Sequence, residues 1–373
     1  MKRTLWLRHE TKPFEERVAL TPKHAAELIE RGHHVVAEYS PTRAFSDEDY
    51  HAVGCEMKAT NSWITEAPSD ATIFGLKELE EENFPLKHRH IHFAHVYKNQ
   101  DGAKDFLARL YRGGGKLFDL EYLVDDKGKR VSAFGVWAGF TGAALGLDLF
   151  IAQKLGLDIN TREPLSSFSS SQELTQTLKA RLSDLSGEKP KVLIIGAKGR
   201  CGRGAKQFFD SVGIEATGWT RKETEGKSHI KELLDFDLIV NCVLMTKKAN
   251  PWLTLDMLDG NQRLSVLSDV SCDPTGPCNP VPVYPKATTM DKPAYYIPGK
   301  NLAVTAIDHL PSLLPKESSE DFSAQLFPHL LNYMEGKIDN GPWARALSLF
   351  YKKMFTYFPE EDTHFDTPSQ ELL

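Results

Sequence analysis

Three glycines form the strongest chemical signal in this sequence. Gly196, Gly199 and Gly202 lie in KVLIIGAKGRCGRGA, directly after an apolar run and before a helical stretch. Glycines at a strand-to-helix turn permit close backbone approach, and the N-terminus of the following helix binds pyrophosphate. A glycine triplet alone is weak evidence for a dinucleotide site, because any such turn can contain glycine. This triplet, however, lies at the start of a strand–helix–strand unit. The pattern predicts a dinucleotide site.

The residues that would hold the adenosine ribose do not decide between NAD and NADP as the cofactor. The fingerprint expects an acidic side chain at the end of the next strand, about 20 residues on, and this chain has GWTRKET there. Thr220 followed by Arg221 suits a 2′-phosphate better than a bare hydroxyl, which slightly favours NADP. The alternative is a solvated turn in which Glu223 or Glu225 holds the ribose.

Charged residues in the first third of the chain lie at or just beyond predicted strand ends, where open α/β sheets bind ligands. The candidates among them are Arg17, Lys77, Glu78, His95, Lys98 and Glu121. Each has a simpler structural interpretation. Lys77 could be an exposed lysine at a strand end, and His95 a hydrogen-bonded core histidine. Arg17 could be a surface charge, and Glu121 a solvated strand end.

A metal site is a second hypothesis for the histidine-rich segment. His88, His90 and His92 alternate, so on a strand they would share one face, and His95 is close by. A three-histidine zinc site also needs defined distances and geometry. Alternating polar residues on a half-exposed strand explain the pattern more simply, and we expect no metal.

The elements that must position these residues alternate between strands and helices. Strand-like runs are Thr4–Leu7, His34–Tyr39, Thr72–Phe74, Ile91–Val96, Leu117–Leu120, Lys191–Ile195, Glu215–Trp219, Leu238–Cys242 and Ser265–Val270. This alternation predicts an α/β fold with parallel sheets. The small-residue run Ala133–Lys154 predicts a buried helix linking two lobes, and the Ser-rich Glu163–Leu174 predicts a surface loop.

Composition limits the classes of function. A chain of 373 residues with 41% hydrophobic residues predicts two globular domains. The net charge of −6 disfavours nucleic-acid and anionic-membrane partners. Five cysteines do not form a disulfide framework, and the charged start MKRTLWLRHETK is not typical of a signal peptide. We expect a cytoplasmic protein.

The ordered motifs resemble one enzyme family. They are RVALTP, GLKE, HFAHVYKNQ, FDLEYL, the glycine loop, SDVSCDPTGPCNPVPVY and IDHLPSLLP. In this order they resemble saccharopine dehydrogenases of the lysine-forming type and, more distantly, alanine dehydrogenases and the transhydrogenase NAD-binding subunit. The resemblance covers most of the chain. It implies oxidative cleavage of saccharopine to L-lysine and 2-oxoglutarate in lysine metabolism, with hydride passing to NAD or NADP.

The resemblance also implies roles for the candidate residues. His95 and Lys77 would be the acid–base pair, and the ordinary pKa of histidine, about 6.5, suits proton exchange near neutrality. Arg17 would clamp a substrate carboxylate through its planar fork. Glu78 and Glu121 would tune the pair and hold substrate ammonium, and Lys98 would bind substrate.

Further cofactor contacts are implied by the same resemblance. They are Ile307, Asp308 and Leu310 in IDHLPSLLP, Arg130 and Phe134 at the hinge, and Arg200 in the glycine loop. A domain-linking turn is the simpler interpretation of IDHLPSLLP. Cys201 and Cys242 match family positions near the cofactor pocket, and reduced thiols are the default in the cytosol.

The family and the helical C-terminal part together predict a discontinuous first domain. We expect residues 1–132 plus 320–373 to form a substrate-side domain and residues 133–319 to form a dinucleotide-binding Rossmann domain, with both ligands in the cleft between the two lobes. A monomer or small homo-oligomer is expected. The alternatives are an alanine dehydrogenase-like or opine dehydrogenase, and a catalytically silent cofactor-binding regulator.

Overall fold

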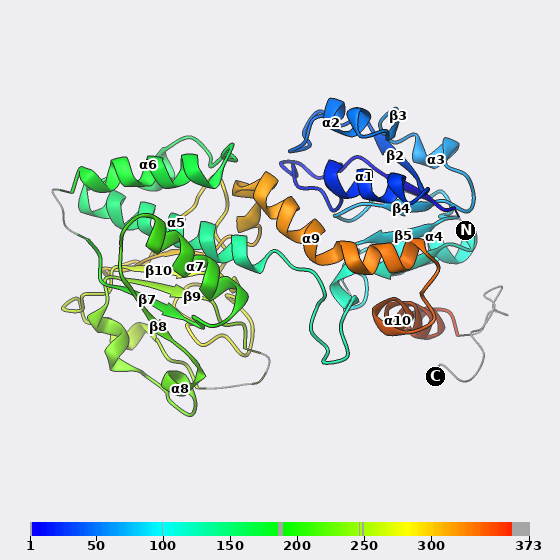
Figure 1. Cartoon of the computed structure of the whole chain (residues 1–373). Helices are drawn as coiled ribbons and strands as arrows, with labels where there is room; N and C mark the ends of the chain where they lie inside the picture. Colours follow the sequence, from blue (N-terminus) through cyan, green and yellow to red (C-terminus); the bar gives the residue numbers. More distant parts are fainter. Residues whose placement is uncertain (1, 99, 186–188, 246, 248–249, 360–373) are drawn as a thin grey trace. The chain divides into compact units, whose positions relative to one another are not determined.

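The computed structural model describes residues 2–98, 100–185, 189–245, 247 and 250–359. Within that description the chain divides into two compact units, Met1–Ala133 with Ser318–Leu373, and Phe134–Glu317. Each unit is built on a six-stranded sheet that is flanked by helices (Figure 1). The α/β fold class with parallel sheets is therefore confirmed.

The first sheet is entirely parallel, with the strand order β3-β2-β1-β4-β5-β6. Its strands are β1 (Thr4–Leu7), β2 (His34–Glu38), β3 (Glu56–Lys58), β4 (Thr72–Phe74), β5 (Arg89–His92) and β6 (Lys116–Asp119). This order is that of a doubly wound fold, so the carboxyl ends of the strands share one edge.

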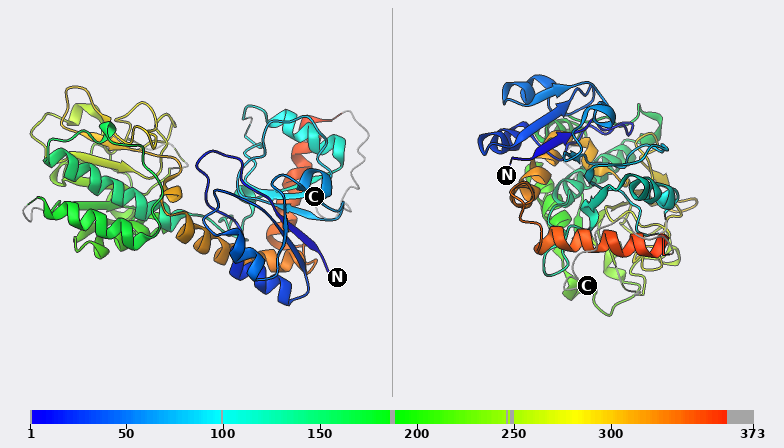
Figure 2. Two further views of the ribbon diagram at one scale, coloured as in Figure 1. Left: turned by 90° about the horizontal axis from the view of Figure 1, so that it is seen from above. Right: turned by 90° about the vertical axis from the view of Figure 1, so that its right-hand side faces the viewer.

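The helices of the first unit come from both ends of the chain. They are α1 (Pro22–Glu30), α2 (Asp47–Ala52), α3 (Trp63–Glu66), α4 (Ala103–Gly113), η1 (Leu120–Tyr122), α9 (Pro315–Met334, from Ser318 on) and α10 (Gly341–Tyr357). In β6, the ring of Phe118 lies 5.3 Å from Tyr333 of α9 and 5.7 Å from Trp343 of α10. The two C-terminal helices therefore complete the core of this sheet (Figure 2).

The second sheet has the order β11-β12-β10-β9-β7-β8, and β11 alone is antiparallel to its neighbour. Its strands are β7 (Val192–Ile195), β8 (Ala216–Trp219), β9 (Leu238–Asn241), β10 (Val266–Asp269), β11 (Tyr295–Tyr296) and β12 (Ala303–Thr305). The unit's helices are α5 (Gly135–Lys154), α6 (Ser171–Ser183), α7 (Arg200–Ser211), α8 (Arg221–Thr224), η2 (Ile159–Thr161), η3 (Lys231–Asp235), η4 (Leu255–Met257) and η5 (Leu310–Leu313).

The two faces of the second sheet bury different partners. Val192 and Ile194 of β7 pack in a core with α5, α6 and α7, whereas Leu193 and Ile195 pack under loops on the opposite face. A strand buried on both faces is expected to be continuously apolar. Helix α5 is long and apolar enough to span a membrane but is mostly buried in this core, as predicted for a core helix.

The Ser-rich segment is only partly the loop that the sequence predicts. Helix α6 begins at Ser171 because the hydroxyl of Ser170 accepts a hydrogen bond from the backbone N–H of Glu173 at 3.1 Å. Serine followed three residues later by glutamate is a helix N-terminus signal. The predicted loop is therefore wrong over its last four residues.

Candidate active site

The candidate catalytic residues follow three neighbouring strands of the first sheet. Lys77 and Glu78 come after β4, and His95 comes after β5. Glu121 lies in η1, which starts directly after β6. Because β4, β5 and β6 are adjacent and parallel, these residues meet at the carboxyl edge of the sheet.

The imidazole of His95 lies between two carboxylates. Its Nδ1 is 3.4 Å from Oε2 of Glu121, and its Nε2 is 3.8 Å from Oε1 of Glu78. Each carboxylate also contacts a lysine: Lys98 Nζ is 2.7 Å from Glu121 and Lys12 Nζ is 3.9 Å from Glu78. The side chain of His95 is 41% exposed, so an incoming molecule can reach the ring.

These contacts set the protonation of the pair. The contact with Glu121, together with the charge of Glu78, raises the pKa of His95 above its ordinary value although burial opposes this. The same contact, with help from Lys98, lowers the pKa of Glu121 to about 2. The carboxylate of Glu121 therefore stays ionised, and His95 keeps its proton to a higher pH than an ordinary histidine.

The backbone at His95 is strained. Its φ of 53° lies in the left-handed region, which residues with a Cβ seldom occupy. The ring of Phe93 stacks beside the imidazole with 6.3 Å between centroids. Strained backbone of this kind clusters at functional sites, where surrounding contacts hold it in place.

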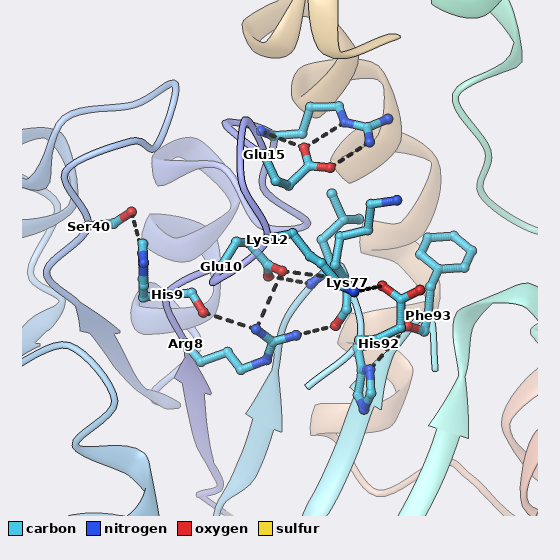
Figure 3. A network of polar contacts seen from close by, with 12 residues as sticks. Arg8, His9, Glu10, Lys12, Glu15, Ser40, Lys77, His92 and Phe93 are labelled. Carbon is cyan, nitrogen blue, oxygen red and sulfur yellow. Dashed lines mark hydrogen bonds and ion pairs between the residues drawn. The ribbon is translucent and has the colours of Figure 1, made fainter. Parts of the chain in front are cut away.

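An ion pair that the sequence did not single out holds the backbone of Lys77 (Figure 3). The carboxylate of Glu10 accepts hydrogen bonds from the N–H of Leu76 at 2.6 Å and of Lys77 at 2.9 Å, and Arg8 donates to the carbonyl of Lys77. Arg8 is only 2% exposed and lies 3.4 Å from Glu10. Gly75 is required because a Cβ there would lie 2.4 Å from Nε of Arg8.

The ammonium of Lys77 makes no hydrogen bond or ion pair within the described residues, while its peptide groups are fixed on both sides. The charge of Lys77 also contributes to lowering the pKa of Glu15. A lysine with a fixed backbone and an uncommitted ammonium is suited to meet a substrate.

Arg17 is buried and already engaged. Its Nε and Nη2 donate to the two carboxylate oxygens of Glu15 at 2.7 and 2.6 Å. Burial pushes the pKa of Glu15 upward, but the charge and hydrogen bonds of Arg17 outweigh it and leave that pKa lowered. The predicted carboxylate fork is therefore present and directed at an internal carboxylate.

A cavity of about 950 Å³ opens beside His95 within the first unit. Its walls come from the segments after β1, β4 and β5 and from the start of α4. Lys12, Glu78, Glu82, Asp105 and Arg109 are among the charged residues that line it. Such a volume is typical of small-molecule sites.

The two residues predicted at the hinge fall in different units. Arg130 is exposed and pairs with Val124 in a short bridge, and its charge acts on Lys98. Phe134 is the N-terminal capping residue of α5. Each unit therefore carries one of them.

In the second unit the glycine loop has the form that the sequence predicts. Gly196 has a φ of 83°, and its N–H donates to the carbonyl of Trp219 at 2.9 Å. A Cβ on Gly202 would lie 2.2 Å from the carbonyl oxygen of Gly196, so the turn requires glycine there. Gly199 precedes Arg200, the first residue of α7, and no side chain caps that helix. This arrangement fits a bound dinucleotide phosphate.

The predicted ribose position is occupied by a capping box. Thr220 follows β8, and its N–H and hydroxyl donate to Oε2 of Glu223 at 2.6 and 2.8 Å. Arg221 is 85% exposed and pairs with Glu225 at 2.9 Å. A carboxylate therefore does lie at the end of this strand, three residues later than the fingerprint expects.

The segment after β12 has mixed exposure. Ile307 and Leu310 are buried in a cluster with Leu145 and Leu313, whereas Asp308 is exposed. In this structure the two apolar side chains serve the core of the unit, and the polar one faces solvent.

The cysteines and histidines of the described residues show no covalent or metal arrangement. All five cysteines, including Cys201 and Cys242, are free thiols. Across the part of the chain that the structure describes, no group of three histidine, cysteine or acidic side chains could hold a metal. Instead His88, His90 and His92 stack edge to face, with 6.3 Å between successive ring centroids.

Family models match both units of the chain. The alanine dehydrogenase/PNT N-terminal domain matches residues 6–141, and the corresponding C-terminal domain matches residues 152–347. Among solved structures, an L-alanine dehydrogenase superposes with a TM-score of 0.67 at 15% identity, covering 95% of this chain and 99% of that one. A transhydrogenase from Sinorhizobium meliloti gives a TM-score of 0.60 at 14% identity, covering 88% and 92%. These likenesses show the fold.

Curated relatives carry a more specific name. The protein named saccharopine dehydrogenase [NAD(+), L-lysine-forming] is 44% identical in Yarrowia lipolytica, over 93% of this chain and 96% of the relative. The proteins of the same name are 44% identical in Neurospora crassa, covering 94% and 96%, and 42% identical in Schizosaccharomyces pombe, covering 93% and 97%. The chain therefore belongs to the saccharopine dehydrogenase (L-lysine-forming) family, within the alanine dehydrogenase/PNT group.

Proposed function

We propose that this chain is a saccharopine dehydrogenase, an oxidoreductase that acts on the CH–NH group of saccharopine and releases L-lysine and 2-oxoglutarate, or runs the reverse reaction. The observation that carries the proposal is the arrangement of His95 between Glu78 and Glu121, next to Lys77, at one sheet edge. It occurs in a chain that is 44% identical to relatives of that name.

The residues at this edge match the proton transfers of the reaction. The secondary amine must lose a proton, water must attack the resulting imine carbon, and the departing amine must gain a proton. His95 is suited to take a proton from the attacking water and return it to the amine, because its pKa is raised by the neighbouring carboxylates. Lys77 is the second acid–base group, with its backbone held by Arg8 and Glu10.

Substrate charges find complementary groups in the first unit. Saccharopine carries three carboxylates and ammonium groups, and we assign the carboxylates to Arg17 and Lys98 and the ammonium to Glu78 and Glu121. A substrate carboxylate at Arg17 would displace Glu15 from the guanidinium, because both would accept hydrogen bonds from the same two N–H groups. The cavity beside His95 gives room for part of the substrate.

The second unit is the dinucleotide-binding unit in this proposal, and the first is the substrate-side unit. Gly196, Gly199, Arg200 and Gly202 would hold the pyrophosphate, because Gly196 and Gly202 have no space for a Cβ and no side chain caps the start of α7. When bound, the nicotinamide accepts the hydride. The further contacts assigned to it are Arg130, Phe134, Thr220, Arg221, Ile307, Asp308 and Leu310.

NAD is the proposed oxidant. The relatives are named for NAD(+), and the carboxylate of Glu223 at the end of β8 would accept hydrogen bonds from a ribose and repel a 2′-phosphate. Arg221 is paired with Glu225, so the preference for NADP that Thr220 and Arg221 suggest gains no support. The free thiols suit a reducing cytoplasm, where we place the protein.

Turnover of saccharopine tests the function. We expect purified protein with saccharopine and NAD to produce the absorbance of reduced nicotinamide, and Lys77→Met and His95→Gln to lower kcat by about 100- to 10,000-fold. Lys87→Met, at an exposed lysine of the same unit, is the control. Turnover only with pyruvate and ammonia would indicate an alanine dehydrogenase, and cofactor binding without any turnover would indicate a silent regulator.

A further inference from the structure

A buried carboxyl group lies directly behind the His95–Glu121 pair. Asp119 is the last residue of β6 and is 1% exposed. Its Oδ1 accepts a hydrogen bond from the backbone N–H of Glu121 at 2.9 Å, which caps the 3-10 turn η1. The orientation of Glu121 toward His95 therefore depends on this carboxyl group.

The second oxygen of Asp119 is poorly satisfied. Oδ2 is buried and finds no hydrogen-bond partner among the described residues, and the same is true of the hydroxyl of Tyr97 nearby. Burying a carboxyl oxygen without a partner is costly, so such a group in a native structure calls for an explanation. The backbone N–H of Ala94 also acts on this carboxyl group, but the hydrogen bond donated by the backbone of Glu121 satisfies only one of its two oxygens.

The charged groups around this carboxyl come from three segments. Glu121 and His95 act on Asp119 directly, and Lys98 neutralises part of the charge of Glu121. From the segment after β4, Glu78 faces His95 and is itself close to Lys12.

The register of the sheet places His92 of β5 opposite Asp119. Tyr97 and Tyr122 are the phenols that its charge affects.

We propose that Asp119 is a positioning residue for the acid–base site: one oxygen holds Glu121 against His95, and the other keeps a second carboxyl group within electrostatic range of the imidazole. The inference rests on the proposed function for its catalytic meaning. Its structural content, that Asp119 holds Glu121 beside His95, stands on the hydrogen bond to the backbone of Glu121 and on the burial of the carboxyl group.

The two carboxyl groups have separate charge behaviour. Burial, with the nearby charge of Glu121, raises the pKa of Asp119 to about 6, against the hydrogen bond from Glu121 and the charge of His95. Glu121 stays ionised, with a pKa of about 2. Asp119 therefore becomes negatively charged as the pH rises past about 6, and that charge favours the protonated imidazole.

Asp119→Asn separates the two roles because its amide oxygen can still accept the N–H of Glu121 but carries no charge. The primary measurement is the NMR titration of the His95 ring, assigned by comparison with His95→Gln. We expect the midpoint to fall by about 0.5 pH unit or more in Asp119→Asn. The limb of the kcat/KM profile that follows His95 moves in the same direction.

A matched control is available in the following turn. Asp125 also accepts backbone N–H groups, from Lys127 and Lys129 at 2.9 Å, but at the surface. Asp125→Asn should leave the His95 midpoint unchanged. Asp119→Ala, which also removes the acceptor, should lower kcat further than Asp119→Asn because Glu121 is no longer held.

An unchanged His95 midpoint in a folded Asp119→Asn protein overturns the inference, as does an equal loss of kcat at all pH values. Should that variant fail to fold, infrared spectra of the unmodified enzyme decide: a buried protonated carboxyl group that titrates at pH about 6 supports the inference, and its absence contradicts it. The NMR and infrared measurements need no substrate. A protein inactive with saccharopine would thus refute the proposed function while leaving this test intact.

Discussion

The two units use the same kind of parallel sheet for opposite purposes. The first unit buries charged and polar side chains at its strand ends, among them Arg8, Glu10 and Asp119. The central strand β7 of the second unit is wholly apolar, VLII, and leads into a backbone loop. The polar residues Asn241 of β9 and Asp269 of β10, which this sheet also buries, are hydrogen-bonded to each other. One sheet therefore positions side chains and the other positions peptide groups.

The polar interior of the first unit is extensive because its residues hold one another. Glu38 is fully buried and accepts hydrogen bonds from the indole N–H of Trp6 and from the backbone N–H groups of His9, Asn61 and Trp63. Such groups are stable only when their hydrogen-bonding capacity is met. A proton-transfer site requires this support because its groups must stay in place while their charges change.

The second unit achieves its precision by removing side chains. Gly139 and Gly204 let α5 and α7 meet backbone to backbone, since a Cβ on either would lie 1.8 Å from a carbonyl oxygen of the facing helix. A phosphate needs N–H groups and close approach rather than titratable groups. The difference teaches that the reacting chemistry, more than the fold, decides what a parallel sheet can bury.

The largest expected effect comes from a substitution that disrupts the close packing of α5 against α7 in the second unit. In Gly204→Val the new side chain would strike the carbonyl of Val136, so α5 and α7 must separate, and we expect a loss of about 3 kcal/mol or more in the free energy of unfolding. Chemical denaturation measures it. Gln207→Val, on the exposed face of the same helix, controls for helix propensity. Equal stability of both variants would show that the close contact is dispensable.

The strands, the core helix and the candidate site residues could be predicted from the sequence, whereas the buried residues that hold them in place could not. Apolar runs and glycine spacing predicted the parallel α/β fold and the core helix α5, because local pattern determines both. Residues just after strands, such as Lys77 and His95, could be predicted to meet because parallel strands share an edge. Glu121, which follows β6, could be predicted to join them for the same reason.

The supports were missed because sequence reports charge but not burial. Arg8 and Glu10 lie in a charged stretch that appears solvent-exposed in the sequence, and only the folded chain shows Arg8 in the space left by Gly75. The sequence leaves Glu223 as one of two alternatives for the ribose, because its distance from the strand end depends on the turn geometry. Long-range contacts such as that of Ser319 with Val18, 301 residues apart, have no local signal.

The next prediction tests the side-chain support of the first unit. Glu10→Gln leaves Arg8 as a buried charge without its anion and weakens the hold on Lys77. We expect a loss of about 3 kcal/mol in stability and of about 10- to 100-fold in kcat, with little change in KM. Denaturation and steady-state kinetics measure the two. Glu56→Gln, at an exposed ion pair, is the control, and a kcat equal to wild type would rule out the positioning role.

The stability of the first unit, which buries several histidines, should fall at acid pH. Burial lowers the pKa of His92 to about 3, so the folded chain binds fewer protons there than the unfolded chain between pH 6.5 and 3. Stability contributed by neutral His92 is therefore lost as pH falls below 6.5. We expect His92→Leu to be about 2 kcal/mol more stable, relative to wild type, at pH 5 than at pH 7.

Urea unfolding at the two pH values measures this change, and the fluorescence of Trp63, whose ring lies 5.5 Å from His90, reports on the first unit. His51→Leu, at an exposed histidine of α2, is the matched control. A pH dependence in His92→Leu as steep as in wild type would mean that the buried imidazole does not cause the acid sensitivity.

The smallest effect concerns the proposed cofactor site of the second unit, where Glu223 adds a carboxylate to the backbone loop. Glu223 holds Thr220 and is exposed enough to meet a ribose, so Glu223→Gln should weaken NAD binding by about 3- to 10-fold and NADP binding less. Titration of both cofactors measures the ratio of the two Kd values. Glu225→Gln should not change that ratio, because Glu225 pairs with Arg221. If instead Glu223→Gln leaves the ratio unchanged while Arg221→Ala weakens NADP alone, the ribose site is cationic, and the proposed preference for NAD is wrong.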